Sequence, residues 1–398
     1  MKLLIPTRIK APTPLPRPTN TPARHHFRPY STHPPIPPSG AAHLTNRRLI
    51  SLHGPDAPKF LQGILTNNVP PNPPSTPLFA AFLTAPGKVL ADTFVYPTLG
   101  SNWHKKQTEA DKKGVAGAED QGFLVEVDAG VAAALVKHLR KHKLRSKFLL
   151  RLIEDGELGV WSRWEEGERW TAHSRSPARV GGEGGVGMVD CRAPGMGQRV
   201  LIEDGEREGL LSEGVQEAAL AAYTARRYLR GVPEGQAEIP WDDALPMNYN
   251  VDIMGGIDFR KGCYVGQELT IRTHHTGVVR RRVLPVALYD AAGEASERLE
   301  YESGSAIGSP EAGADVRKAD KRKRAVGKFI GSVGNVGLAM CRLEQMSDLT
   351  ISGEGSTFSP EDKFVVQNVA GEELGVKAFV PDWMRGKIRE PKIQKRVE

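Results

Sequence analysis

The chain has 398 residues, of which 39% are hydrophobic and 25% are charged. This composition is typical of a globular protein with two or three domains. It contains no apolar run of about 18 residues or more, which excludes a membrane-spanning helix. The three cysteines, Cys191, Cys263 and Cys341, are far apart and form no CxxC pair. A disulfide scaffold and a self-contained Cys-rich metal site are therefore excluded as well.

The formal charge of +7 originates mostly near the N-terminus. Of the 54 Lys and Arg residues, six precede residue 41, and the other 48 nearly balance the 47 acidic residues. We therefore expect no nucleic-acid binding through bulk charge.

The N-terminal segment has no acidic residue before Asp56 and is rich in Arg and Thr. Such a leader is typical of a mitochondrial transit peptide, which we predict over residues 1–43. Eleven prolines by residue 38 restrict any amphipathic helix to Met1–Lys10. A disordered proline-rich tail is the alternative.

The first elements of the body are expected near the end of this leader. Leu49–Leu52 reads as a short strand, and Asp56 is placed to cap a helix that carries Phe60 and Leu61. Phe79–Leu83 and Val89–Tyr96 read as a hairpin around a Pro-Gly turn. The polar stretch 101–121 is aperiodic and reads as a surface insertion.

The remainder of the body mixes further strands and helices. Strands are predicted at 123–127, 148–153, 158–161 and 278–288, helices at 131–140 and 212–230, a flexible glycine-rich loop at 181–187, and C-terminal barrel strands at 326–343 and 373–380. Gly231 is expected to end the second helix. The basic run 317–324 reads as a solvated loop, with nucleic-acid contact the less favoured reading.

One segment carries the candidate chemistry. Gly262 and Gly266 flank Cys263, so the backbone there can turn tightly and approach a ligand or partner. Positive charge at Arg260 and Lys261 favours the thiolate, the form that binds metals or attacks electrophiles. These residues alone leave two alternatives open, a reactive cysteine and a buried cysteine that acts as a small hydrophobe.

Gln267 and Glu268 follow directly and supply polar groups at the start of a helix or strand. The whole run Lys261-Gly262-Cys263-Tyr264-Val265-Gly266-Gln267-Glu268 resembles the signature of the folate-binding YgfZ-type proteins. It is especially similar to their mitochondrial members, which are iron–sulfur cluster assembly factors. Weaker similarities extend over about residues 44–383, and wider relatives include the aminomethyltransferase of the glycine cleavage system.

The resemblance implies an α+β fold, an aminomethyltransferase-like ring of modules around a folate-accepting hole. The expected modules are a discontinuous folate-binding-like module (44–120 plus 206–275), a second α+β module (121–205) and a C-terminal β-barrel module (276–398). A low-complexity insertion is expected near 291–323 of the barrel module.

The resemblance also implies a function, the maturation of 4Fe–4S proteins in the mitochondrial matrix together with A-type scaffold proteins. A cluster needs about four protein ligands, usually thiolates. Since the chain offers one plausible cysteine, Cys263 would be one ligand of a cluster held transiently with the scaffold. Lys261 and Arg260 would favour the thiolate and attract the anionic cluster. Arg272, His274 and His275 are candidates for the same surface, with hydrogen bonding the favoured role of the histidines.

The alternative function is a folate-dependent one-carbon (aminomethyl-type) transferase or a tRNA-modifying enzyme. Tetrahydrofolate would then use Asp92 for the pterin and Arg227 for its anionic glutamate tail. Ala91 stands at a neighbouring position that is acidic in the transferase pattern, which weakens methyl-transfer catalysis. Cys191 reads as a tolerated structural substitution. Such an enzyme does not need Cys263, whereas the assembly role does; no membrane partner is expected in either case.

Overall fold

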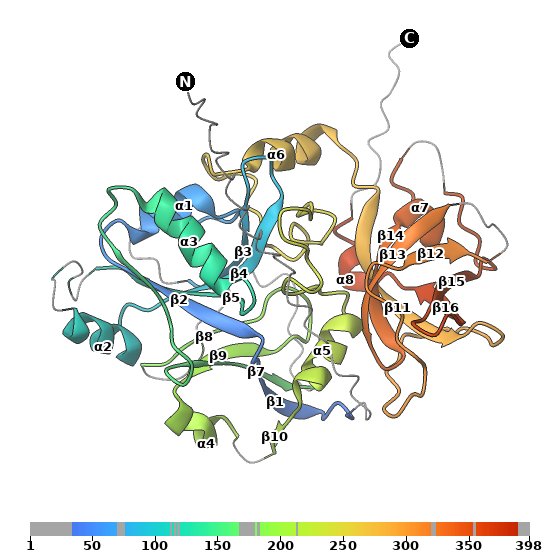
Figure 1. Cartoon of the computed structure of the whole chain (residues 1–398), viewed down its shortest axis with the longest axis horizontal. Helices are drawn as coiled ribbons and strands as arrows, with labels where there is room; N and C mark the ends of the chain where they lie inside the picture. The colour runs from blue at the N-terminus through green and yellow to red at the C-terminus, as the bar shows by residue number, and fades with distance from the viewer. Residues whose placement is uncertain are drawn as a thin grey trace, which may run out of the picture. The chain divides into compact units, whose positions relative to one another are not determined.

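Two five-stranded sheets and a closed six-stranded barrel make up the fold (Figure 1). The computed structural model describes residues 34–69, 76–111, 114, 117, 120–166, 180, 184–211, 214–319, 324–352 and 356–388. No helix in these ranges is long and apolar enough to cross a bilayer.

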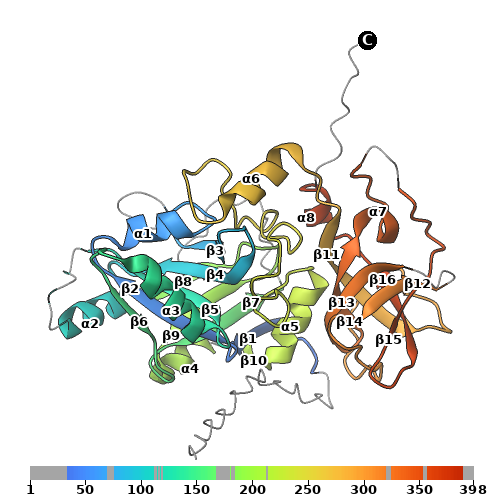
Figure 2. The same cartoon turned by 45° about the horizontal axis from the view of Figure 1, so that its top comes forward.

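The first sheet is antiparallel and has the order β3-β4-β5-β2-β6. Its strands are β2 (Arg47–His53), β3 (Leu78–Leu83), β4 (Val89–Pro97), β5 (Gly122–Asp128) and β6 (Leu149–Leu152). Helices α1 (Ala57–Ile64) and α3 (Ala132–Lys143) lie side by side against this sheet (Figures 1 and 2). Their apolar stripes, which include Phe60, Leu61 and Leu135, share a core with Ile50 and Leu52 of β2.

The second sheet has the order β10-β1-β7-β9-β8. Its strands are β1 (Ser39–His43), β7 (Gly159–Glu165), β8 (Val186–Val189), β9 (Gln198–Ile202) and β10 (Gln216–Glu217). Side chains from both sheets, among them Phe94 and Trp164, form one buried core. The sheets divide the chain differently from the expected modules: β5 and β6 belong to the first sheet, and β1 and β10 to the second.

The barrel closes in the order β11-β14-β13-β12-β15-β16 and confirms the predicted C-terminal β-barrel. Its strands are β11 (Arg281–Asp290), β12 (Asp315–Lys318), β13 (Ala325–Val333), β14 (Val336–Arg342), β15 (Phe364–Gln367) and β16 (Glu373–Ala378). Two short helices, α7 (Leu343–Met346) and α8 (Asp382–Arg385), accompany it. Strand β12 lies inside the predicted insertion 291–323, so that prediction was wrong at its C-terminal end. Residues 320–323 of the predicted basic loop lie outside the described ranges.

The remaining helices correct two sequence-based predictions. They are α2 (Asn102–Ala110), a 3-10 turn η1 (Asp204–Glu206), α4 (Arg207–Leu210), α5 (Leu220–Leu229) and α6 (Gln267–Thr276). Helix α2 lies in the stretch predicted to be aperiodic, where the Ser101 side chain caps it and Trp103 is buried. Helix α5 begins eight residues later than predicted, because β10 precedes it. Gly231, just beyond α5, has a φ of +69° as expected for a residue that ends a helix.

The N-terminal boundary also differs from the prediction. Strand β1 pairs with β7 inside the predicted leader 1–43, and Ala41 and Ala42 are fully buried. Upstream of it, the Trp164 indole donates to the carbonyl of Pro37 at 2.9 Å, and the Tyr301 hydroxyl donates to that of Pro34 at 2.9 Å. The folded chain therefore includes residues from Pro34 onward. Residues 1–33 lie outside the described ranges, and the transit peptide stays a prediction.

Candidate functional site

The loop that precedes α6 is fixed by Lys261. The Lys261 ammonium donates to the backbone carbonyls of Gln62, Leu65 and Asn67 at 2.8, 2.7 and 2.8 Å. These carbonyls lie at and just beyond the C-terminal end of α1, where backbone carbonyls have no N–H partner within the helix. Burial lowers the pKa of Lys261 to about 8. Lys261 is thus an anchor for the loop, whereas the sequence suggested that it acts on the Cys263 thiol.

The two glycines of the signature have different roles. Gly266 has a φ of +80° and forms the N-cap of α6. A Cβ on Gly266 would lie 2.3 Å from the carbonyl oxygen of Thr84, so only glycine fits there. A Cβ on Gly262 would meet no atom within 4 Å. Gly262 therefore leaves open space beside Cys263.

Cys263 is exposed, between the anchored Lys261 and the buried Tyr264. The Gln267 side chain accepts a hydrogen bond from the backbone N–H of Tyr264 at 3.1 Å and so closes the turn into α6. Glu268 is exposed in the first turn of that helix. The sequence-based alternative of a buried structural cysteine is therefore wrong for Cys263.

Arg272 and the histidine pair, His274 and His275, all lie on α6. The rings of Phe259 and His274 stack with centroids 3.5 Å apart, and His275 meets His274 edge-on. Arg272 and His275 are exposed. The stacking ties the start of the loop to the last turn of α6, so the Cys263 segment is held at both ends.

The other two cysteines are unsuited to ligation. Burial raises the pKa of both thiols, Cys191 and Cys341, to about 12. The Cys341 thiol is fully buried in the barrel and donates to the carbonyl of Ala339 at 3.4 Å. Within the described ranges, no three His, Cys, Asp or Glu side chains come together in a way that could hold a metal ion.

The predicted folate residue Asp92 is paired within the protein. Its carboxylate is 0% exposed, lies 3.2 Å from Nη1 of Arg47 and accepts the backbone N–H of Gly235 at 3.0 Å. A pterin could reach Asp92 only by displacing these partners. The predicted pterin contact therefore does not fit this arrangement.

The predicted folate residue Arg227 is in the same situation. It makes two hydrogen bonds of 2.8 Å to the Glu238 carboxylate and a third, of 2.9 Å, to the carbonyl of Val232. Only 2% of Arg227 is exposed. A guanidinium with this set of acceptors has little capacity left for a glutamate tail.

Asp92 and Arg227 belong to a larger ionic network between the two sheets, which the sequence did not reveal. The Glu234 carboxylate lies 2.8 Å from Nη1 of Arg192, pairs with Arg199 and accepts the Tyr223 hydroxyl at 2.8 Å. Burial raises the pKa of Glu234, but attraction by Arg199 and Arg192 outweighs it and holds that pKa well below its usual value. These charges come from distant strands and loops, so no local motif could have identified the network.

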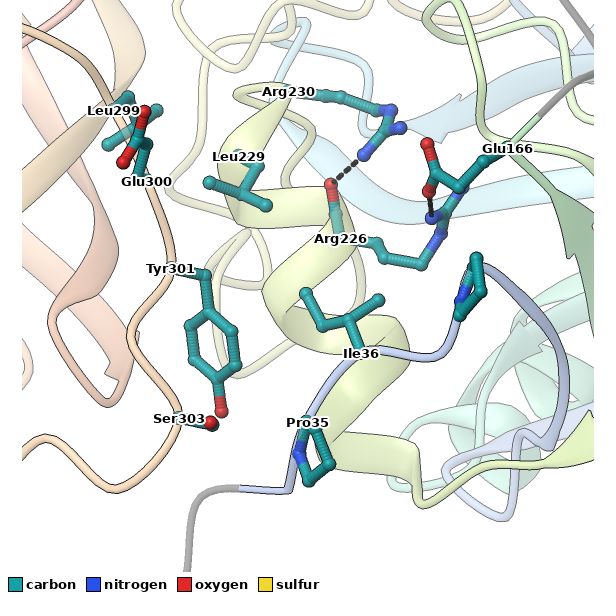
Figure 3. A pocket seen from close by; sticks show the side chains of 11 residues that line it. Pro35, Ile36, Glu166, Arg226, Leu229, Arg230, Leu299, Glu300, Tyr301 and Ser303 are labelled. Carbon is teal, nitrogen blue, oxygen red and sulfur yellow. Dashed lines mark hydrogen bonds and ion pairs between the residues drawn. The ribbon is translucent and has the colours of Figure 1, made fainter.

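A cavity of about 640 Å³ lies beside α5 (Figure 3). Its lining includes Arg226 and Arg230 on the helix, Glu166, Tyr301 and the N-terminal residues Pro35 and Ile36. Arg226 pairs with Glu166, whereas Arg230 has no carboxylate partner among the described residues. Burial and the neighbouring charge of Arg226 lower the pKa of Arg230 to about 10. Arg226 and Arg230 therefore line this cavity, whereas the predicted Arg227 does not.

The fold and the site can be compared with known proteins. A solved structure, the glycine cleavage system aminomethyltransferase T from Bartonella henselae, matches with a TM-score of 0.57 at 13% identity, over 89% of this chain and 88% of that one. The match confirms the aminomethyltransferase-like fold. Residues 280–386 match the model of the CAF17 C-terminal beta-barrel domain.

Closer relatives cover nearly the whole chain. A protein of Aspergillus fumigatus named mitochondrial iron–sulfur cluster assembly factor IBA57 homolog is 45% identical over 93% of this chain and 87% of its own length. Identically named proteins of Neosartorya fischeri and Coccidioides immitis are 45% and 44% identical over 92% and 89% of this chain and over 87% and 85% of their own lengths. The chain therefore belongs to the family of the mitochondrial iron–sulfur cluster assembly factor IBA57.

Proposed function

We propose that this chain is a mitochondrial iron–sulfur cluster assembly factor that contributes the Cys263 thiolate to a cluster held jointly with a partner protein. The observation that carries the proposal is the exposed thiol of Cys263 on a loop fixed at both ends. The cluster is cargo in this proposal, bound during transfer and then released.

The ligand count requires a partner. A cluster takes about four protein ligands, and the described part of the chain brings neither a second exposed cysteine nor a group of three potential metal ligands together near Cys263. The partner must therefore supply most of the thiolates. The family resemblance points to A-type scaffold proteins as partners and to 4Fe–4S proteins of the matrix as recipients.

The shape of the loop suits shared ligation. Gly262 leaves the space beside Cys263 open, and Gly266 directs the chain into α6 directly afterwards. A pre-ordered ligand loses little conformational entropy when it binds. A partner could thus approach the thiol while Lys261 and the Phe259–His274 stack keep the loop in place.

The transferase alternative has less support. The carboxylate of Asp92 and the guanidinium of Arg227 are both occupied by protein groups. Folate binding stays a prediction, and its better location is the cavity of Figure 3, where Arg226 and Arg230 can offer donors to carboxylates. Calorimetry with tetrahydrofolate on the Arg230→Gln variant tests that location, because Arg230 forms no ion pair with a described residue that its loss would break.

Complementation tests the proposed function. Cells that lack the protein are supplied with the wild-type chain, Cys263→Ala, or the control Cys191→Ala. We expect Cys263→Ala to accumulate at the wild-type level but to leave matrix 4Fe–4S enzymes inactive, whereas Cys191→Ala restores them. Full enzyme activity with Cys263→Ala would show that the thiol is dispensable and that the proposal is wrong.

A further inference from the structure

The C-terminal end of α3 forms a strongly basic surface that the proposed function does not use. We call it the basic tip, and it consists of six exposed cations and one exposed leucine: Lys59, Lys137, Arg140, Lys141, Arg145, Lys147 and Leu144. Lys59 belongs to the tip through α1, because the neighbouring Phe60 ring packs against Phe148 with centroids 4.9 Å apart. The sequence 129–153 contains no Asp or Glu.

Helix α3 separates its two faces sharply. Its buried stripe is apolar, with Leu135, Val136 and Leu139 packed on the first sheet. Lys137, Arg140 and Lys141 follow the i, i+3, i+4 spacing and are exposed away from this stripe, and Leu144 follows directly after the last residue of the helix. This outward face combines cations with small or apolar side chains.

The cationic side chains of the basic tip form no ion pairs with described residues, although the Asp56 carboxylate accepts the backbone N–H of Lys147 at 2.6 Å. None of the six has a carboxylate at ion-pair distance within the described ranges. A helix C-terminus is stabilised by one or two cations in its last turn, and the effect falls off within that turn. Lys59, Arg145 and Lys147 lie outside α3 and gain nothing from that effect. The chain after residue 40 is nearly neutral overall, so the positive charge of the basic tip is a local concentration and does not reflect a generally basic protein.

Leu144 stands out among these cations. Its side chain is 86% exposed, and its φ of 46° is one that a leucine rarely adopts. Single exposed leucines are common on protein surfaces. A leucine kept in a strained conformation, at the end of a basic helix face and between Lys143 and Arg145, is not explained by folding alone.

We infer that the basic tip docks on the surface of an anionic phospholipid bilayer, with Leu144 inserted between the headgroups and the surrounding cations on their phosphates. Basic residues beside an inserted apolar side chain are the features of interfacial binding. The docking is peripheral and differs from membrane spanning, for which the described helices are too short. Sequence analysis led us to expect no membrane partner, because it considered only spanning segments.

Nucleic acid is the competing polyanion. Sequence-tolerant binding of single strands combines a basic groove with aromatic side chains on which the bases stack. Phe60 and Phe148 are buried beneath the basic tip, and the exposed ring beside its cations, the imidazole of His142, already packs against His138 with centroids 4.3 Å apart. An exposed leucine side chain can insert into the apolar part of a bilayer, whereas a phosphate backbone offers it no apolar contact.

Vesicle flotation with the full chain tests the inference. We expect the protein to float with phosphatidylcholine vesicles that contain cardiolipin and to stay behind with vesicles of phosphatidylcholine alone. Raising the salt concentration should weaken the binding severalfold. Absence of flotation with cardiolipin vesicles would overturn the inference, and so would binding to single-stranded RNA without binding to vesicles.

Two variants and one control locate the contact. Lys141→Glu should reduce vesicle binding at least about tenfold, and Lys363→Glu, the same charge change at an exposed lysine of the barrel module, should leave it unchanged. Leu144→Gly relieves the backbone strain, so its melting temperature should be equal or higher while vesicle binding falls. Equal loss with Lys141→Glu and Lys363→Glu, or wild-type binding with Leu144→Gly, would contradict the docking mode.

Discussion

The Lys261 ammonium lies 2.7 Å from the carbonyl oxygen of Leu65, a residue 196 positions earlier in the chain. The Cys263 loop is thereby attached to the end of α1, the helix that packs against the first sheet. The position of the thiol depends on this attachment, because Cys263 has an anchored Lys261 on one side and the buried Tyr264 on the other.

Replacing Lys261 with methionine removes the donor shared by three carbonyls. We expect Lys261→Met to lower the free energy of unfolding by about 2–3 kcal/mol, since carbonyls that lose a buried partner keep their desolvation cost. Arg260→Met is the control, because Arg260 is exposed. Urea unfolding of both variants measures the difference, and equal stabilities would show that Lys261 is not an anchor.

Alanine should lower the stability of the protein at one signature glycine, Gly266, and leave it almost unchanged at the other, Gly262. Gly266→Ala forces a positive φ on alanine and places its Cβ against the Thr84 carbonyl, so we expect a loss of about 2 kcal/mol or more. Gly262→Ala should change stability by less than about 0.5 kcal/mol. Thermal unfolding distinguishes the two, and comparable melting temperatures would contradict the loop geometry.

Sequence patterns predicted the structural elements that are determined by residues close together in the chain. The hairpin around Pro86-Gly87, the helix at Phe60 and Leu61, the end of α5 at Gly231 and the barrel were confirmed. The start of α5 was missed because a short strand pairing, β10 with β1, interrupts the helical pattern, and such a pairing depends on a distant residue range. Local sequence carries no information on a partner so far away.

The candidate site shows the same difference between features set by local sequence and features set by contacts with distant residues. The signature identified Cys263 and the need for Gly266, both properties of a short segment. The partners of Lys261 lie at and just beyond the end of α1, and those of Asp92 and Arg227 lie in other strands and loops, so a local motif could not show these contacts. The role of a residue that forms ion pairs with distant parts of the chain can be assigned only from the three-dimensional structure.

The buried network makes a prediction about pH. The folded-state pKa of Glu234 lies well below its unfolded value near 4.5. Below that unfolded value the unfolded chain binds more protons, so the stabilisation by Glu234 is complete above about pH 4.5 and is lost as pH falls. We expect Glu234→Gln to cost about 3–5 kcal/mol at pH 7, because Arg192 and Arg199 lose their partner, and to weaken the loss of stability on acidification.

Urea unfolding of wild type and Glu234→Gln at pH 7 and pH 4 measures this. The exposed Glu268→Gln is the control and should behave as the wild type at both pH values. A Glu234→Gln variant as stable as the wild type at pH 7 would show that the network does not depend on this charge.

The mature N-terminus is predicted to precede Pro34. Removal of residues up to 43 would delete β1 and with it the buried Ala41 and Ala42. Mass spectrometry of the protein isolated from mitochondria locates the end. A mature chain that starts at Leu44 would contradict the role of β1, and one that starts at Met1 would contradict the transit peptide.

The thiolate of Cys263 is the central claim, and cluster reconstitution tests it most directly. The mature chain and an A-type scaffold protein are mixed anaerobically with iron and sulfide, and the visible absorption of the co-eluting complex is compared between wild type, Cys263→Ala and Cys191→Ala. The account predicts that Cys263→Ala melts at nearly the wild-type temperature but forms no joint cluster, whereas Cys191→Ala forms it. A joint cluster of wild-type intensity with Cys263→Ala would contradict the account.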